Sequence, residues 1–86
     1  MTPVEFLVST ALRHSIDEAN VEAGFERFEA ITGRVIGFQE FRDTVDACLR
    51  ESLIKEPIRL SERALQCRWR LELTPHGIAV ARLISA

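Results

Sequence analysis

Apolar positions recur every three or four residues through the first half of the chain, a spacing typical of one face of an α-helix. The opening segment Thr2-Pro3-Val4-Glu5 has the residues of a capping box, and proline at the first helical position loses no hydrogen bond. The pattern therefore predicts a first helix of about 17 residues, with Asn20 as its stop and as the start of the next segment. The apolar stripe of this helix comprises Val4, Leu7, Val8, Ala11, Leu12, Ile16 and Ala19.

Two more amphipathic segments follow. The second predicted helix ends at Gly33, because glycine readily adopts the left-handed conformation that follows a last helical turn. Gly24 lies beside the apolar stripe of this helix, where glycine costs about 1 kcal/mol relative to alanine. Either the helix begins after Gly24, or the missing side chain lets another helix approach closely. The second stripe comprises Val21, Phe25, Phe28 and Ile31, and that of the third helix comprises Phe38, Phe41, Val45, Cys48, Leu49 and Leu53.

The spacing of apolar positions changes from about 3.6 residues to two residues in the second half of the chain. In residues 65–73 every odd position is apolar and every even position is polar, as in a half-buried antiparallel strand. Upstream, Ile54, Ile58 and Leu60 predict a partner strand with polar residues between them. Pro57 has no amide donor, so this partner strand is expected at the edge of the sheet.

The chain closes as it opens, with a capping residue followed by proline. Thr74-Pro75 predicts a short terminal helix, whose apolar residues are Ile78, Val80, Ala81, Leu83 and Ile84. The predicted order is therefore helix, helix, helix, strand, strand, helix. This order defines an α+β fold class that is mostly helical.

The overall composition fits one globular domain spanning residues 1–86. The chain is 47% hydrophobic and 28% charged and contains only 4 Gly and 3 Pro, a composition typical of a folded protein. A chain of this size buries roughly 60–65% of its unfolded surface, which leaves little material for a deep substrate pocket beside a core. Composition therefore favours a binding protein over an enzyme.

Targeting and membrane signals are not expected. No apolar run exceeds the four residues 78–81, against the ~20 that a membrane-spanning helix needs. The N-terminus carries Glu5 rather than a basic region, unlike a secretory signal. The two cysteines, Cys48 and Cys67, are far apart and suit a reducing compartment. We therefore expect a cytoplasmic protein with no membrane partner.

No motif for catalysis, metal binding or a cofactor is present. The chain has no nucleophile elbow, zinc-binding helix or phosphate loop. His14 and His76 each lack a second histidine or cysteine at metal-binding spacing. Cys67 beside Trp69 would suit a redox or metal sensor, but both lie on the apolar face of the predicted strand, and packing accounts for them first. We expect no catalytic residue, no metal and no cofactor.

Two local segments bring in a family resemblance. Leu53-Ile54-Lys55-Glu56 is similar to the exit from the recognition helix into the first wing strand of the winged helix-turn-helix superfamily. The segment from Arg70 to Gly77, with Trp69 near the position of an aromatic residue, resembles the end of the wing in many small bacterial transcriptional regulators. The resemblance implies a winged helix: a three-helix core, a two-stranded β-hairpin wing and a short C-terminal helix. Residues 38–52 would be the recognition helix and residues 61–64 the wing tip.

The function that this resemblance implies is DNA-binding transcription regulation by a homodimer. Winged helices also serve as protein-interaction modules, so a protein partner is the alternative. The net charge of −2 is distributed unevenly: residues 1–33 carry −4, residues 34–53 carry −1 and residues 54–86 carry +3. Since DNA binders concentrate Lys and Arg where phosphates lie, the predicted wing is the better DNA contact and the helices are the weaker one.

Candidate binding residues lie on the outer face of the third predicted helix. Gln39, Arg42 and Arg50 suit base edges or phosphates, because arginine forks onto guanine and glutamine onto adenine. Asp43 and Asp46 on the same face oppose DNA. The alternative is that Arg42 with Asp46 and Asp46 with Arg50 form ordinary i,i+4 ion pairs, each worth about 0.2–0.5 kcal/mol.

The remaining candidates are a basic and an acidic surface. The basic patch, which suits phosphates or an acidic protein, comprises Arg59, Arg63, Arg68 and Arg70. The acidic stripe of the second helix comprises Glu22, Glu26 and Glu29. This stripe is either a solvated helix face or an interface that meets the arginine-rich wing of another copy.

Overall fold

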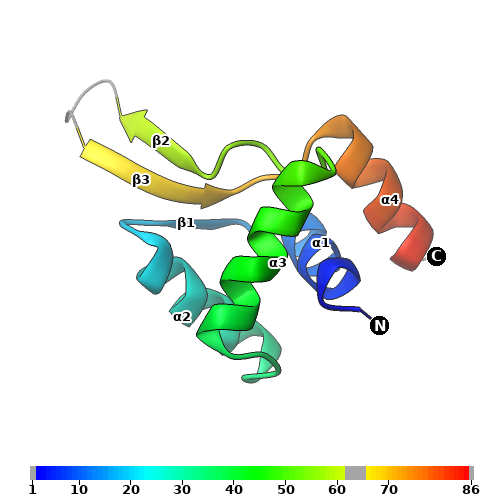
Figure 1. The fold of residues 1–86 in the computed structure, drawn as a ribbon, viewed down its shortest axis with the longest axis horizontal. Coiled ribbons are helices and arrows are strands. Elements are labelled where there is room, and N and C mark those ends of the chain that lie inside the picture. Colours follow the sequence, from blue (N-terminus) through cyan, green and yellow to red (C-terminus); the bar gives the residue numbers. More distant parts are fainter. Residues whose placement is uncertain (1, 62–65, 86) are drawn as a thin grey trace.

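The computed structural model describes residues 2–61 and 66–85, with side chains omitted at 59–67 (Figure 1). It shows a mostly helical α+β arrangement in which helices pack beneath one face of a small antiparallel sheet. The elements in chain order are α1 (Pro3–Arg13), β1 (Ile16–Glu18), α2 (Val21–Thr32), α3 (Phe38–Arg50), β2 (Ile58–Ser61), β3 (Gln66–Leu71) and α4 (Pro75–Ser85).

The sheet has the strand order β1-β3-β2, so β3 lies in the middle. Ile16 of β1 pairs with Leu71, and Ile58 of β2 pairs with Trp69. Trp69 and Leu71 are buried while Arg68 and Arg70 are exposed, which confirms the predicted alternation. β2 lies at an edge, as predicted from Pro57.

The first helix is shorter than predicted, and the residues after it form a strand that the sequence pattern did not reveal. α1 ends at Arg13, and His14 already has an extended backbone with φ −133° and ψ 135°. Ile16 is fully buried because it pairs with Leu71 in the sheet. A three-residue strand has only one apolar position that faces the core, which is too few to show alternation. Ile16 also fits the helical spacing of the preceding residues, so the sequence pattern assigned it to the helix. Similarly, α3 ends at Arg50 rather than at 52.

Side-chain caps begin α1, α2 and α4, at residues that the sequence predicted. The Thr2 amide donates to Glu5 Oε1 (3.1 Å), and the Glu5 amide donates to Thr2 Oγ1 (3.2 Å). Hydrogen bonding of the Glu5 carboxylate to Thr2, first of all to the Thr2 backbone amide, lowers the pKa of Glu5 below its usual value. The side chain of Asn20 accepts from the Ala23 amide (2.8 Å) and starts α2. Thr74 Oγ1 accepts from the Gly77 amide (2.9 Å) at the start of α4.

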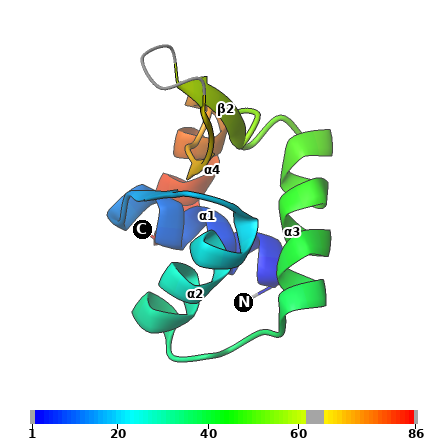
Figure 2. The ribbon, with the colours of Figure 1, turned by 90° about the vertical axis from the view of Figure 1, so that its left-hand side faces the viewer.

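The core joins the helices to the sheet through a chain of aromatic rings. Phe28 of α2 and Phe41 of α3 are fully buried, with ring centroids 5.1 Å apart. Phe41 also lies 5.7 Å from Trp69 of β3, and Phe28 lies 5.8 Å from Phe6 of α1. These contacts fix α3 against the other elements and leave its opposite side facing outward (Figure 2).

Gly24, near the start of α2, allows a close approach, but not by the helix that was predicted. A Cβ atom at this position would lie 2.6 Å from Cζ3 of Trp69. The indole of β3 therefore occupies the space that any larger side chain would need. The close approach joins a helix to the sheet.

The helices are short relative to a bilayer. Within residues 2–61 and 66–85, none is long and apolar enough to span a membrane.

Candidate functional site

The outward face of α3 is the most regular exposed surface among the predicted site residues. Phe41, Val45 and Cys48 point into the core, so residues between them in the helical repeat face solvent. Gln39, Arg42, Asp43, Asp46 and Arg50 are all exposed, as the spacing predicted. Figure 2 shows α3 as one flank of the molecule, with β2 beyond its C-terminal end.

The polar contacts on α3 differ from the expected ion pairs. Gln39 Nε2 donates to Asp43 Oδ1 at 3.0 Å. The guanidinium of Arg42 lies 5.9 Å from the ring centroid of Phe38, within cation–π range. In the part of the chain that the structure describes, no ion pair joins Asp46 to Arg42 or to Arg50. The arginines on this face therefore keep their guanidinium groups available for a ligand.

On the outer face of the sheet, arginines and carboxylates alternate. Arg68 Nε donates to Asp17 Oδ1 at 2.8 Å, and its Nη2 donates to the Asp17 carbonyl at 3.3 Å. Arg70 Nε lies 4.0 Å from Glu72 Oε2, while Lys55 Nζ lies 3.2 Å from Glu72 Oε1. The predicted basic patch is thus partly neutralised. Sequence reasoning missed Asp17 as a partner because it placed this residue in a helix.

The other two arginines of the predicted patch fall where the structure gives no side-chain position. The backbone of Arg59 lies in β2 and pairs with that of Arg68, but its side chain lies outside the described part. Arg63, within the predicted wing tip at residues 61–64, lies in the segment 62–65 that is not described. The structure therefore brings together Arg68 and Arg70 from the patch.

The acidic stripe of α2 does not form one solvated face. Glu22 and Glu26 are exposed, but Glu29 is only 6% exposed. Neither carboxylate oxygen of Glu29 has a hydrogen-bond partner among the described residues. The chain that follows α2 returns toward it, and Arg34 and Ile36 line a hollow together with Glu29. Of the two alternatives for this stripe, a fully solvated helix face does not hold at Glu29.

An apolar surface beside α3 was not predicted. Ile58 of the edge strand is 63% exposed, although it pairs with the buried Trp69. Two hollows of about 210 and 230 Å³ flank it, and both are lined by Val21, Ile58 and Trp69. The alternation of apolar and polar residues predicted β2 as a strand. It could not predict the exposed fraction of Ile58, which depends on neighbouring elements.

Burial raises the pKa of the Cys48 thiol from its ordinary 9.0 to about 11, and the charge of Glu51 adds to the shift. The folded protein therefore holds this proton more tightly than the unfolded chain does. Stability from this group is fully present below pH 9 and is lost as the pH rises from about 9 to 11. We expect urea denaturation of a Cys67→Ser variant to show this alkaline loss.

Replacing Cys48 with alanine in the same background is the control. This variant is less stable at neutral pH because it leaves a cavity, but its stability falls less between pH 9 and 11. The chain contains no tyrosine and a single lysine, so few other groups titrate in this range. An equal alkaline loss in both variants would assign the effect to another group.

The positions of histidines and cysteines among the described residues do not suggest a metal site. Within the described residues, no group of three His, Cys, Asp or Glu side chains is placed to hold a metal ion. His14 and His76 are both exposed, and the side chain of Cys67 lies outside the described part.

Comparisons of the chain with protein-family models, with curated proteins and with solved structures gave no match.

Proposed function

We propose that this protein is a cytoplasmic winged-helix regulator that binds DNA as a homodimer, through α3 and the hairpin of β2 and β3. The observed order α1, β1, α2, α3, β2, β3 and α4 supports the proposal, because three helices precede the strand pair β2 and β3 and one helix follows it. In a helix-turn-helix arrangement the second helix of the pair enters the major groove, which assigns recognition to α3.

The observation that carries the proposal is the pair of exposed arginines on α3. Arg42 and Arg50 are eight residues apart, which corresponds to about 12 Å along a helix axis. This length is close to the width of the major groove, about 12 Å, so both arginines reach phosphates or base edges from one docked helix. Neither is engaged by Asp46, which lies between them in sequence.

The carboxylates of the same face limit how DNA is approached. Asp43 is held by Gln39, and Asp46 is exposed without an ion pair to its neighbouring arginines. Both aspartates would repel the phosphates of DNA, so binding requires that the arginines lie closer to the DNA than the aspartates do. Replacing Asp46 with asparagine would then strengthen binding.

The test is fluorescence anisotropy with short labelled duplexes drawn from genomic DNA at low salt. The wild-type protein is expected to bind with micromolar affinity, and Arg42→Gln with Arg50→Gln to weaken binding about tenfold or more. The double variant also reduces the slope of log K against log salt by about 2. Arg27→Gln, which removes an exposed arginine from α2, is the matched control and leaves binding unchanged.

Three results would count against DNA binding: no anisotropy change with wild-type protein, an equal loss in the Arg27 control, or an Asp46→Asn variant that binds no better. The homodimer is tested separately, by sedimentation equilibrium at several salt concentrations. Glu22 and Glu26 remain exposed for contact with the wing of a second copy, so Glu26→Gln is expected to weaken the dimer.

A protein-interaction winged helix is the second candidate, and Ile58 favours it. This exposed side chain and the apolar hollows beside it offer a partner an anchor that DNA does not use. The partial neutralisation of Arg68 and Arg70 points the same way. A complex purified from the native host that is lost with Ile58→Asn, but retained with Arg42→Gln and Arg50→Gln, would support this function over DNA binding.

A further inference from the structure

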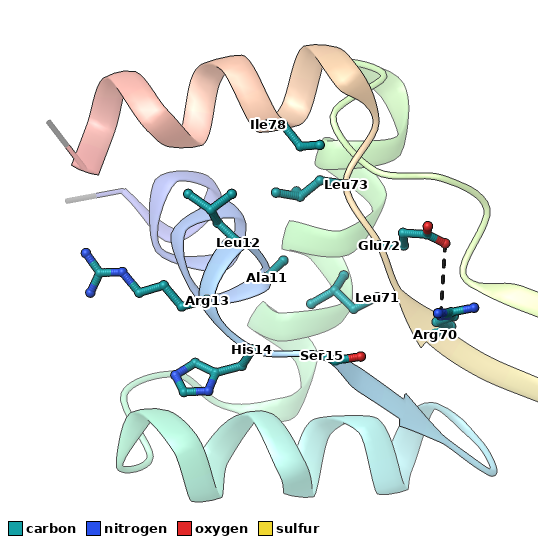
Figure 3. A pocket seen from close by; sticks show the side chains of 10 residues that line it. All are labelled: Ala11, Leu12, Arg13, His14, Ser15, Arg70, Leu71, Glu72, Leu73 and Ile78. Carbon is teal, nitrogen blue, oxygen red and sulfur yellow. Dashed lines mark ion pairs between the residues drawn. The ribbon is translucent and has the colours of Figure 1, made fainter.

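We propose that a groove formed by the end of α1, the end of β3 and the start of α4 binds a small amphipathic carboxylate, with the carboxylate held by Arg13. The groove has a volume of about 320 Å³ (Figure 3). Pockets for small molecules range from about 300 to 1,000 Å³ and combine an apolar lining with a few polar groups. This groove has both parts.

Its floor is apolar. Leu71 and Leu73 come from the end of the sheet, Leu12 from α1 and Ile78 from the first turn of α4. Figure 3 shows these side chains gathered between the two helices and the strand. Leu12 and Ile78 are only partly buried, so apolar surface remains for a ligand to cover.

Its rim carries two arginines. Arg13 and His14 lie on one side of the groove, and Arg70 lies on the other (Figure 3). On the Arg70 side the charge is partly balanced, because Glu72 lies 4.0 Å from Arg70 and 3.2 Å from Lys55. Arg13 makes no ion pair within the described residues. The charge that complements this rim is negative.

A second hollow shares Arg13 and His14 with the groove. It has a volume of about 410 Å³ and is lined by Arg13 and His14 together with Phe6, Ile31 and Ile84. Ser9 also lines it, and the buried Oγ of Ser9 has no hydrogen-bond partner among the described residues. Arg13 therefore lines two hollows that each contain apolar side chains, so an anion bound at Arg13 has apolar surface nearby for its tail.

Volume sets the size of the ligand. The groove equals the volume of about ten water molecules, since each occupies about 30 Å³ in the liquid. A straight-chain carboxylate of about eight carbons is of this order. Such a ligand covers the leucines of the floor with its tail and places its carboxylate at the rim, where a bidentate contact with arginine is available.

The test is a titration of the isotope-labelled protein with sodium octanoate below its micelle concentration, followed by NMR. We expect saturable shifts of the amides of residues 11–15, 71–73 and 78, and small changes on α3. Arg13→Gln is expected to weaken binding about tenfold, because it removes the charge while leaving an exposed position polar. Arg27→Gln is the matched control and keeps the wild-type affinity.

Head-group chemistry is tested with octanol and octylammonium, which have the same tail. Octanoate is expected to bind at least several times more tightly than octanol, and octylammonium more weakly than either. Equal binding of octanoate and octanol would overturn the role of the cationic rim. Shifts spread over the whole chain without saturation would overturn the site itself.

Arg13 also lies in the last turn of α1, where a cation offsets the helix dipole. If this were its only role, Arg13→Gln would lower the melting temperature and leave octanoate binding unchanged, which would contradict the proposal. The titration contains no DNA, so its outcome is independent of the DNA-binding assay.

Discussion

Replacing Gly77 with alanine is expected to lower the free energy of unfolding by about 3 kcal/mol or more, a large part of the total of about 4–13 kcal/mol for a chain of this length. A Cβ atom at Gly77 would collide with the backbone carbonyl of Leu53, whose carbon would lie 2.9 Å away. A side chain can rotate away from such a collision, but a backbone carbonyl cannot.

The surroundings of Gly77 give this collision no room to relax. The Leu53 carbonyl accepts from the Thr74 amide at 3.0 Å, and Thr74 Oγ1 donates to the Ser52 carbonyl at 2.6 Å. The start of α4 is therefore tied to the residues that follow α3. Moving α4 to accommodate a methyl group breaks these bonds and uncovers Leu53, which is only 3% exposed.

Urea denaturation followed by circular dichroism measures this effect, and Gly37→Ala is the matched control. Gly37 has φ −82°, and a Cβ atom there would meet nothing within 4 Å. Because Gly37 is the N-cap of α3, where alanine is less favourable than glycine, its replacement is expected to cost up to about 1 kcal/mol, still well below the loss at Gly77. A Gly77→Ala variant as stable as Gly37→Ala would show that the collision is readily relieved.

Replacing Gly24 with alanine is expected to destabilise the protein by about 1–3 kcal/mol. Alanine at this position, one turn into α2, gains at most about 1 kcal/mol of helix propensity. The new methyl group would, however, meet the ring of Trp69, with Cζ3 at 2.6 Å. Trp69 is itself wedged against Phe41, so the ring has little freedom to move. Overpacking therefore outweighs propensity.

A double-mutant cycle with Trp69→Leu isolates this contact. Trp69→Leu alone is destabilising because it removes a buried aromatic ring, but Gly24→Ala added to it is expected to cost nothing or to stabilise. The chain has a single tryptophan, so its fluorescence also reports the displacement in Gly24→Ala. A Gly24→Ala variant more stable than the wild type would contradict the close approach seen in the structure.

Local signals account for what the sequence could predict of the fold. Thr2, Asn20 and Thr74 cap helices through bonds to residues three positions away, so a short sequence window contains the whole interaction. β3 was predicted for the same reason, because its alternation extends over many residues. β1 was not, because a strand of three residues is specified by its partner 50 or more residues away rather than by its own pattern.

The candidate site divides in the same way. The exposure of Arg42 and Arg50 follows from helical geometry alone and was predicted. The pairing of Asp17 with Arg68 joins residues 51 positions apart and depends on the register of β1. The burial of Glu29 depends on the path of residues 33–37 over α2. These contacts depend on the assembled fold and could not be predicted from a short stretch of sequence.

The central position of β3 also determines the order in which the sheet can form. β2 precedes β3 directly, so their hairpin needs only a short loop to close. Pairing of β1 with β3 closes a loop of about 50 residues, which costs about 1.5 kcal/mol more than a loop one fifth as long. During synthesis β1 therefore has no strand to pair with until residue 71 has emerged from the ribosome. α1, α2 and α3 are synthesised before the three-stranded sheet can form.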